Sequence, residues 1–159
     1  MKITLITIGR LKDKFFVDAS AEYEKRLSKY CKLDIKTIEA ARLPSDPSDS
    51  DVAEALKQEC EKIKKALPGS CDIIPMCIEG KQLSSEELSS KMEDLTLHGT
   101  SHICFIIGGS YGISDEIKKL ATLKLSMSKM TFPHRLARIM LLEQLYRAFK
   151  ITEGSNYHK

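Results

Sequence analysis

Short runs of β-branched and other apolar residues alternate along this chain with segments whose apolar residues recur at helical spacing. This alternation constrains the fold more than any other feature. The runs predict strands at Ile3–Ile8, Leu33–Ile38, Cys71–Ile78, His102–Ile107 and Thr122–Met127. Strands that alternate with helices predict an α/β fold with a mostly parallel sheet flanked by helices. The 159 residues suit a single domain of this kind, 1-159.

The helical segments are recognised by their apolar faces and by their ends. We expect helices at about Phe15–Leu27, Asp51–Ala66, Ser84–His98, Ser114–Ala121 and Pro133–Phe149. Ser84 and Glu87 match a capping box at the start of the third helix, and Pro133 suits the first turn of the last one. The loop at 40–51 is short enough to be an exposed connection within one domain.

The last predicted helix differs from the others because it is apolar nearly all round between Leu136 and Phe149. A helix with apolar residues on more than one face must be buried on more than one face. In a chain this small, a second copy is a natural cover for such a helix, so we expect a homodimer. The alternative is a central helix wrapped by its own domain.

Positive charge is concentrated at the C-terminal end of the chain. Residues 129–159 carry six basic and two acidic side chains, a local charge of +4, whereas the net charge of the whole chain is +3. This concentration favours a polyanionic partner, although a basic helix face in solvent has the same composition.

Several features are absent from the sequence. No apolar run approaches the roughly 20 residues of a membrane helix. The N-terminal residues read as a strand rather than a signal peptide, so we expect a cytoplasmic protein that makes no membrane contact. The five cysteines form no CxxC pair, and no short ligand spacing involves the histidines, so we expect free thiols and no metal.

Three predicted strands run directly into polar or glycine-containing segments. These segments are Glu79-Gly80-Lys81, Gly108-Gly109-Ser110-Tyr111-Gly112 and Ser128-Lys129-Met130-Thr131-Phe132-Pro133-His134. In α/β sheets ligands bind beyond the carboxyl ends of the strands, and glycines let the backbone approach a flat ligand. The spacing is not the GxGxxG of a dinucleotide site, and neither a P-loop nor the GxSxG motif of a hydrolase is present.

Residues 106–112 and 125–134 resemble the cofactor-binding region of SPOUT methyltransferases. With 143–148 and the terminal Tyr157-His158-Lys159, the resemblance narrows to the RlmH family of bacterial ribosomal large-subunit pseudouridine N3-methyltransferases. The first strand and residues 23–27 fit as well, so the resemblance covers essentially the whole chain. It implies a SPOUT fold with a C-terminal trefoil knot, a feature that no periodicity indicates and that is rare among folds.

The resemblance also implies a reaction and its partners. Members of this family use S-adenosyl-L-methionine to methylate N3 of a pseudouridine in the decoding-region stem-loop of 23S rRNA, act on the assembled ribosome, and work as homodimers. Carried over by position, the expected cofactor-binding residues are Met76, Gly108, Met127, Ser128, Lys129, Met130, Thr131 and Phe132. Met76 occupies a place where leucine is usual, and its side chain can still pack on adenine.

The expected catalytic residues are Arg147, Tyr157 and His158. The acceptor nitrogen of a uridine-like base carries a weakly acidic proton, so a base, or a charge that stabilises the anion, would help the reaction. We expect Tyr157 and His158 to shape the acceptor pocket, and His158 or a water to assist proton removal. Arg147 would steady the RNA or the developing anion.

Phosphate contacts are expected from Lys159, Arg135 and Arg138. Two of the proposed roles have structural alternatives. Arg147 could instead form an i,i+4 pair with Glu143 on the last helix. The C-terminal tail could be a frayed terminus.

Three other functions stay open on the sequence alone. A related SPOUT enzyme that acts on transfer RNA would share the cofactor loops. A non-catalytic ribosome- or RNA-binding module would keep the fold but lose those loops, which look intact here. An ordinary nucleotide-binding enzyme is disfavoured because the phosphate-binding motifs are missing.

Overall fold

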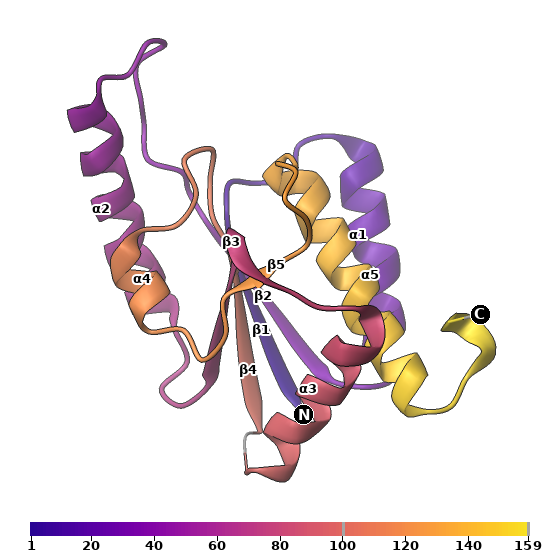
Figure 1. The fold of residues 1–159 in the computed structure, drawn as a ribbon. Helices are drawn as coiled ribbons and strands as arrows, with labels where there is room; N and C mark the ends of the chain where they lie inside the picture. The colour runs from indigo at the N-terminus through magenta and orange to yellow at the C-terminus, as the bar shows by residue number, and fades with distance from the viewer. Residues whose placement is uncertain (100, 159) are drawn as a thin grey trace.

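The computed structural model describes residues 1–99 and 101–158, and in it a central sheet lies between two layers of helices (Figure 1). The strands are β1 (Lys2–Ile8), β2 (Lys32–Ile38), β3 (Asp72–Gln82), β4 (His102–Ile107) and β5 (Leu125–Ser126). They lie side by side in the order β2-β1-β4-β3-β5. Each pairing between these strands is parallel. The prediction of an α/β fold with a mostly parallel sheet is therefore confirmed.

The helices divide between the two faces of the sheet (Figure 1). One face is covered by α1 (Lys14–Leu27), α3 (Ser85–Leu97) and α5 (His134–Thr152), and the other by α2 (Asp49–Ala66) and α4 (Asp115–Lys119). The larger core cluster lies under α1, α3 and α5, and the smaller one lies under α2 and α4. A short 3-10 helix, Asn156–His158, follows α5 and packs against it.

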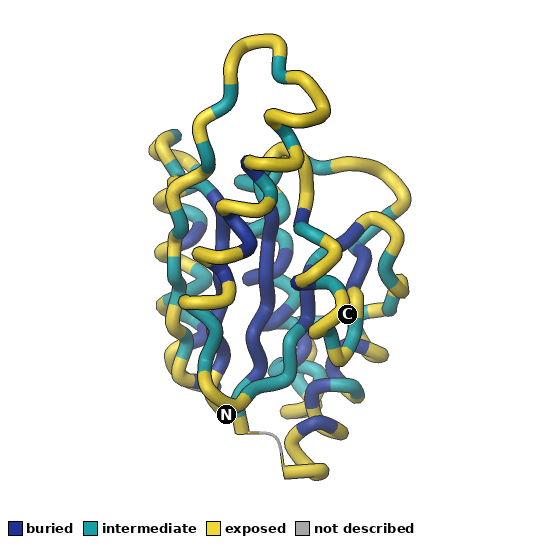
Figure 2. The backbone as a smooth tube through the Cα atoms, turned by 90° about the vertical axis from the view of Figure 1, so that its left-hand side faces the viewer, coloured by how far each residue is buried: buried dark blue, intermediate teal, exposed yellow. Residues whose placement is uncertain are grey.

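The position of each strand in the sheet accounts for its sequence. β1 and β4 lie in the interior of the sheet and are buried along almost their whole length, as the dark blue strands of Figure 2 show. Strands covered on both faces read as continuous apolar runs, which is the pattern that these two have. β2 lies at the edge, and charged residues alternate with apolar ones along it.

Helix starts follow the caps in the sequence. The Ser48 hydroxyl accepts a hydrogen bond from the Asp51 N–H, and the Asp51 carboxylate accepts one from the Ser48 N–H. α2 therefore begins at Asp49, two residues before the expected start, and the exposed loop that precedes it is correspondingly shorter. The capping box predicted for Ser84 and Glu87 is present.

The boundaries of β3 and β5 differ from the prediction. β3 continues to Gln82, beyond the expected end at Ile78, whereas β5 is only two residues long. The pairing of β3 with β5 contains a register shift, because both Met76 and Lys81 pair with Leu125, and this irregular pairing accounts for the different strand lengths. Gly80 permits this close pairing, because a Cβ there would lie 2.8 Å from the backbone of β5. The residues after Ser126 are thereby left to form a loop at the carboxyl edge of the sheet.

The chain itself covers only part of α5. Leu141, Leu142, Leu145 and Ala148 are buried in the core, whereas Leu136 is 37 % exposed. The alternative that the domain wraps α5 entirely is therefore wrong for the side of α5 that carries Leu136. The homodimer stays a prediction, as does the trefoil knot. Among the described residues, no helix combines the length and the apolar character needed to cross a membrane.

Candidate active site

A cavity of about 870 Å³ opens at the carboxyl edge of the sheet, where the ends of β3, β4 and β5 meet the start of α5. Its walls come from Met76–Glu79, Ile107–Ile113, Leu125–Ser128, Met130–His134, Lys118 and Ala137. All three strand ends singled out in the sequence therefore contribute to one cavity. We call it the edge cavity.

The structure brings together the residues expected to bind the cofactor. Except for Lys129, every one of them lines the edge cavity: Met76, Gly108, Met127, Ser128, Met130, Thr131 and Phe132. Lys129 is exposed and is not among the lining residues. The seven lining residues come from three separate parts of the chain, and their meeting in one cavity supports the assignment, although cofactor binding itself stays a prediction.

The loop after β4 requires glycine. A Cβ at Gly108 would lie 2.2 Å from the carbonyl oxygen of Gly112 and 2.8 Å from Cγ1 of Ile113, so no side chain fits there. Gly112 has φ +82°, in the left-handed region that favours glycine, and its N–H donates to the Gly109 carbonyl at 3.1 Å. The backbone is therefore folded tightly on itself against the cavity.

Two serines shape the loop between β5 and α5. The Ser126 hydroxyl, which is buried, donates to the Ser128 carbonyl at 2.9 Å. The Met130 N–H donates to the Ser128 hydroxyl at 3.0 Å. Hydrogen bonds inside the loop thus fix the backbone that forms one wall of the edge cavity.

Three polar residues of the edge cavity were not assigned roles from the sequence. Lys118 and Glu79 form an ion pair at 2.6 Å, and the Lys118 ammonium lowers the pKa of the Glu79 carboxyl. His134 stands at the start of α5, where burial and then the Arg135 charge lower the pKa of its imidazole. In the sequence, His134 stands out only as the last residue of the 128–134 segment. Nothing in the sequence spacing indicates that Lys118 reaches this cavity.

A second cavity, of about 500 Å³, lies between α3 and α5 and adjoins the first. The two share Met76, Leu125, Ser126 and Met127 as lining residues. The polar lining residues of this second cavity are Tyr23, Ser84, Ser85, Ser126, Glu143 and Gln144. We call it the α3–α5 cavity.

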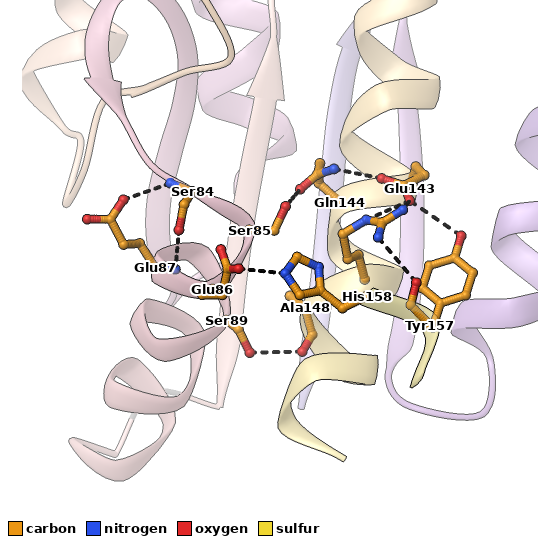
Figure 3. Close-up of polar contacts among 11 residues, drawn as sticks. Ser84, Ser85, Glu86, Glu87, Ser89, Glu143, Gln144, Ala148, Tyr157 and His158 are labelled. Carbon is orange, nitrogen blue, oxygen red and sulfur yellow. Dashed lines mark hydrogen bonds and ion pairs between the residues drawn. The ribbon is translucent and has the colours of Figure 1, made fainter. Parts of the chain in front are cut away.

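A polar network connects the α3–α5 cavity with the C-terminal tail (Figure 3). The Ser85 hydroxyl donates to Gln144 at 2.6 Å, and the Gln144 amide donates to Glu143 at 2.7 Å. Glu143 in turn accepts from Arg147 Nη2 at 2.6 Å and from the Tyr157 hydroxyl at 3.4 Å. The i,i+4 pair considered for Arg147 therefore exists, as one link of a longer network.

Arg147 also holds the tail in place. Its Nη1 donates to the Tyr157 carbonyl at 3.3 Å, and its guanidinium lies 4.8 Å from the centre of the Tyr157 ring. His158 Nε2 lies 2.5 Å from the Glu86 carboxylate on α3. Burial raises the pKa of the Tyr157 phenol, so the hydroxyl keeps its proton at neutral pH. The alternative of a frayed terminus is wrong for 156–158, which form a 3-10 helix, while Lys159 lies outside the described residues.

The structure does not bring the tail into either cavity. Arg147, Tyr157 and His158 are absent from the lining of both the edge cavity and the α3–α5 cavity. Within one chain, the residues predicted to bind the cofactor and those predicted to act on the acceptor form two separate groups.

The arginines expected to contact phosphate are occupied elsewhere. Arg135 pairs with Asp13 at 2.8 Å, and the Arg138 side chain, 11 % exposed, donates to the Ser20 hydroxyl at 3.1 Å and faces Glu24. Both therefore join α5 to α1. This arrangement corrects the phosphate-contact prediction for Arg138, because so little of its side chain can reach a ligand.

One group of described side chains has the composition of a metal site. Cys60, Glu61 and Glu116 present ligand atoms that all lie within 4.8 Å of one another. Lys64 forms ion pairs with both carboxylates, at 3.1 and 2.6 Å. The ammonium already engages both carboxylates and offsets part of the charge that would attract a cation, so these ion pairs account for the group.

Comparison with known proteins gives whole-length matches. The family model described as "Predicted SPOUT methyltransferase" matches residues 1–158. The Ribosomal RNA large subunit methyltransferase H of Bifidobacterium adolescentis is 52 % identical over 159 residues, which are 100 % of both chains. The protein of the same name from Clostridium acetobutylicum is 48 % identical over the same full length.

Solved structures share the fold at low sequence identity. The tRNA (m1G37) methyltransferase of Aquifex aeolicus has a TM-score of 0.51 and 12 % identity, over 92 % of this chain and 70 % of that one. A Legionella pneumophila protein, described as a methyltransferase in complex with the bound cofactor SAM, has a TM-score of 0.51 and 14 % identity, over 94 % and 66 %. At these identities the likeness concerns the fold alone.

Proposed function

This chain belongs to the SPOUT methyltransferase family, and we propose that it transfers a methyl group from S-adenosylmethionine to a base of large-subunit ribosomal RNA. The observation that carries the proposal is the edge cavity, which gathers the glycine loop, the 127–132 loop and Met76 in one place. The relatives that match over their full length are named for the same activity. The acceptor we propose is N3 of a pseudouridine in the decoding-region stem-loop, on the assembled ribosome in the cytoplasm.

The residues of the edge cavity fit such a cofactor. Its volume of about 870 Å³ lies within the range of small-molecule sites, which are typically about 300 to 1,000 Å³. Met76, Ile107 and Phe132 offer apolar surface to an adenine ring, while the Ser128 and Thr131 hydroxyls and the exposed loop backbone can hydrogen-bond to polar groups. When bound, the cofactor supplies an activated methyl group on a sulfonium.

The contribution of this chain is then to position and to exclude water. Gly108 and Gly112 keep the loop after β4 close to the cavity, and the hydrogen bonds of Ser126 and Ser128 fix the opposite loop. A rigid wall on both sides limits the poses that a ligand can take, which favours an in-line approach of the acceptor. The lowered pKa of His134 keeps that side chain neutral near a cationic ligand.

For the acceptor we propose that Arg147, Tyr157 and His158 act together. A guanidinium can stabilise the negative charge that develops on a deprotonated base, and His158 or a water can take the proton. Since these residues line neither cavity of their own chain, we propose a homodimer in which each tail completes the partner's site. The partly exposed outer side of α5, with Leu136 and Met140, is the surface we propose for contact.

The experiment is methyl transfer from labelled S-adenosylmethionine to purified ribosomes, separated subunits and bulk transfer RNA in parallel. Label in large-subunit RNA from assembled ribosomes is the expected result. Label in transfer RNA would keep the cofactor but overturn the ribosomal acceptor. If nothing is labelled and calorimetry shows no cofactor binding, the chain is a binding module rather than an enzyme. Nucleoside analysis of the labelled RNA then tests the N3 position.

A further inference from the structure

A third cavity lies at the amino ends of the strands, at the opposite edge of the sheet from the edge cavity. It measures about 520 Å³ and is formed by the starts of β1, β2 and β4 together with the turn at 68–70 that follows α2. Its polar lining consists of Lys2, Thr4, Lys32, Asp34, Lys36, Ser70 and His102. None of these residues has a part in the proposed methyl transfer.

The sequence of the strands explains why the cavity exists. On the face toward α2, β1 begins with Lys2 and Thr4 and continues with Ile6 and Ile8, which are buried under α2. The neighbouring strands follow the same order, since polar residues precede apolar ones on this face of both β2 and β4. α2 therefore covers only the carboxyl half of this face and ends at Ala66, so the polar half remains open beside the turn.

The charge of the cavity is strongly one-sided. Lys2, Lys32 and Lys36 contribute three ammonium groups and Asp34 a single carboxylate. Within the described part of the chain, no salt bridge within 4.0 Å joins any of these four side chains to another group. Lys36 Nζ donates to the Ala66 carbonyl at 2.9 Å, which fixes that ammonium at the wall.

His102 lies in the same cavity in a fixed orientation. Its Nε2 lies 2.8 Å from the hydroxyl of Thr4, a residue that is 2 % exposed, so the ring is anchored to the sheet. Burial lowers the pKa of the His102 imidazole, the charges of Lys2 and Lys36 lower it further, and Asp34 opposes them. The cavity thus already disfavours one more positive charge, because the site is partly buried and the lysines outnumber the single carboxylate.

We propose that this cavity binds a phosphate group, and that in the working complex the group is a backbone phosphate of the RNA substrate. Several ammonium groups around one concave site match the charge of a phosphate, and lysine binds phosphate as a mobile point charge. The Ser70 hydroxyl offers a further donor at the rim. Phosphate binding itself stands on the cavity alone, whereas its assignment to RNA rests on the proposed function.

The first test uses the full-length protein with labelled histidines and inorganic phosphate, at constant ionic strength and pH 7. The His102 resonances are expected to shift in a saturable way and the His102 pKa to rise, while His98, exposed at the end of α3, serves as the internal control. Lys36→Gln is expected to weaken phosphate binding about tenfold, and Lys2→Gln provides a second variant at an exposed position. Lys57→Gln, an exposed lysine on α2, is the matched control and should change nothing.

The outcomes separate the site from its source of phosphate. A His102 shift no larger than that produced by chloride at equal ionic strength, or one unchanged in both Lys36→Gln and Lys2→Gln, overturns the site. If phosphate binds, the doubly substituted Lys2→Gln, Lys36→Gln protein should lower the salt slope of ribosome binding by about 1 to 2, with unchanged cofactor affinity. An unchanged slope would assign the cavity to free phosphate instead. Failure of wild-type methyl transfer would overturn the proposed function but not the phosphate site.

Discussion

The edge cavity and the C-terminal tail are built in different ways. The walls of the edge cavity are mostly backbone and apolar side chains. They are held by the close backbone contact at Gly108 and by hydrogen bonds between neighbouring residues of the 126–130 loop. The tail is held mainly by contacts of polar side chains: those of Arg147 with Glu143 and with the Tyr157 carbonyl, and that of His158 with Glu86. The residues proposed to bind the cofactor therefore lie together within one chain, whereas those proposed to act on the acceptor belong to a polar region that lines no cavity of its own chain.

The largest effect is expected from Gly108→Ala. A Cβ would lie 2.2 Å from the Gly112 carbonyl, so the loop must move and the edge cavity must change shape. Cofactor affinity, measured by calorimetry, should fall by about 100-fold or more, since overpacking and lost contacts each cost about 1 to 3 kcal/mol. Circular dichroism establishes whether the fold persists. Unchanged affinity in a folded variant would remove the glycine loop from the cofactor site.

The next effect is expected from Arg147→Gln, which removes the contacts of Arg147 with Glu143 and the Tyr157 carbonyl but leaves the edge cavity intact. Methyl transfer should fall by about 100-fold, the typical effect of removing one group that stabilises developing charge. Cofactor affinity should stay within about twofold of wild type, because Arg147 lines neither cavity. Lys25→Gln, an exposed lysine of α1, is the matched control. A parallel loss of cofactor affinity would contradict the separation of the two regions.

A smaller effect is expected from pH. The pKa of His134 is lowered by burial, so the ring is neutral at pH 7 and gains its charge only at a pH below the usual 6.5. A positive charge there would repel a sulfonium ligand. Cofactor affinity should therefore be flat above pH 6.5 and fall as the pH drops through the lowered pKa. In the same window the fold loses stability, because the unfolded chain binds the proton more readily. Titration calorimetry of wild type and His134→Gln checks this, since the variant should lose the acid-side fall.

The smallest effect is expected from Lys129→Gln. Lys129 belongs to the loop that resembles the cofactor site, yet it is exposed and does not line the edge cavity. Its removal should change cofactor affinity by less than about twofold, as is usual for exposed surface positions. A tenfold loss in calorimetry would mean that the loop closes around the ligand and that the edge cavity is incomplete as it stands.

The sequence was most informative where backbone geometry depends on residue type. The apolar runs of β1 and β4, the capping box at Ser84 and the glycines after β4 each predicted local structure correctly, because each has a short-range physical cause. β5 was predicted too long, because its length depends on the irregular pairing with β3 near Gly80. That contact joins segments far apart in the sequence.

Side-chain partners across elements could not be foreseen in the same way. Arg138 was expected to face a ligand, but its pairing with Ser20 and Glu24 depends on how α5 packs against α1. The role of Lys118 at the edge cavity likewise depends on the placement of α4. The grouping of the expected cofactor residues around one cavity was implied only by the resemblance, since nothing in their spacing brings Met76 near Phe132.

The separation of the two regions is tested most directly by mixing the two inactive variants, Gly108→Ala and Arg147→Gln. If each tail completes the site of its partner, exchange produces mixed dimers in which one site has an intact cavity and an intact tail. Such a mixture should regain about a quarter of wild-type methyl transfer for a two-fold symmetric dimer with random exchange. If mixing under conditions that exchange subunits restores no activity, the tail acts within its own chain and the account of a shared site is wrong.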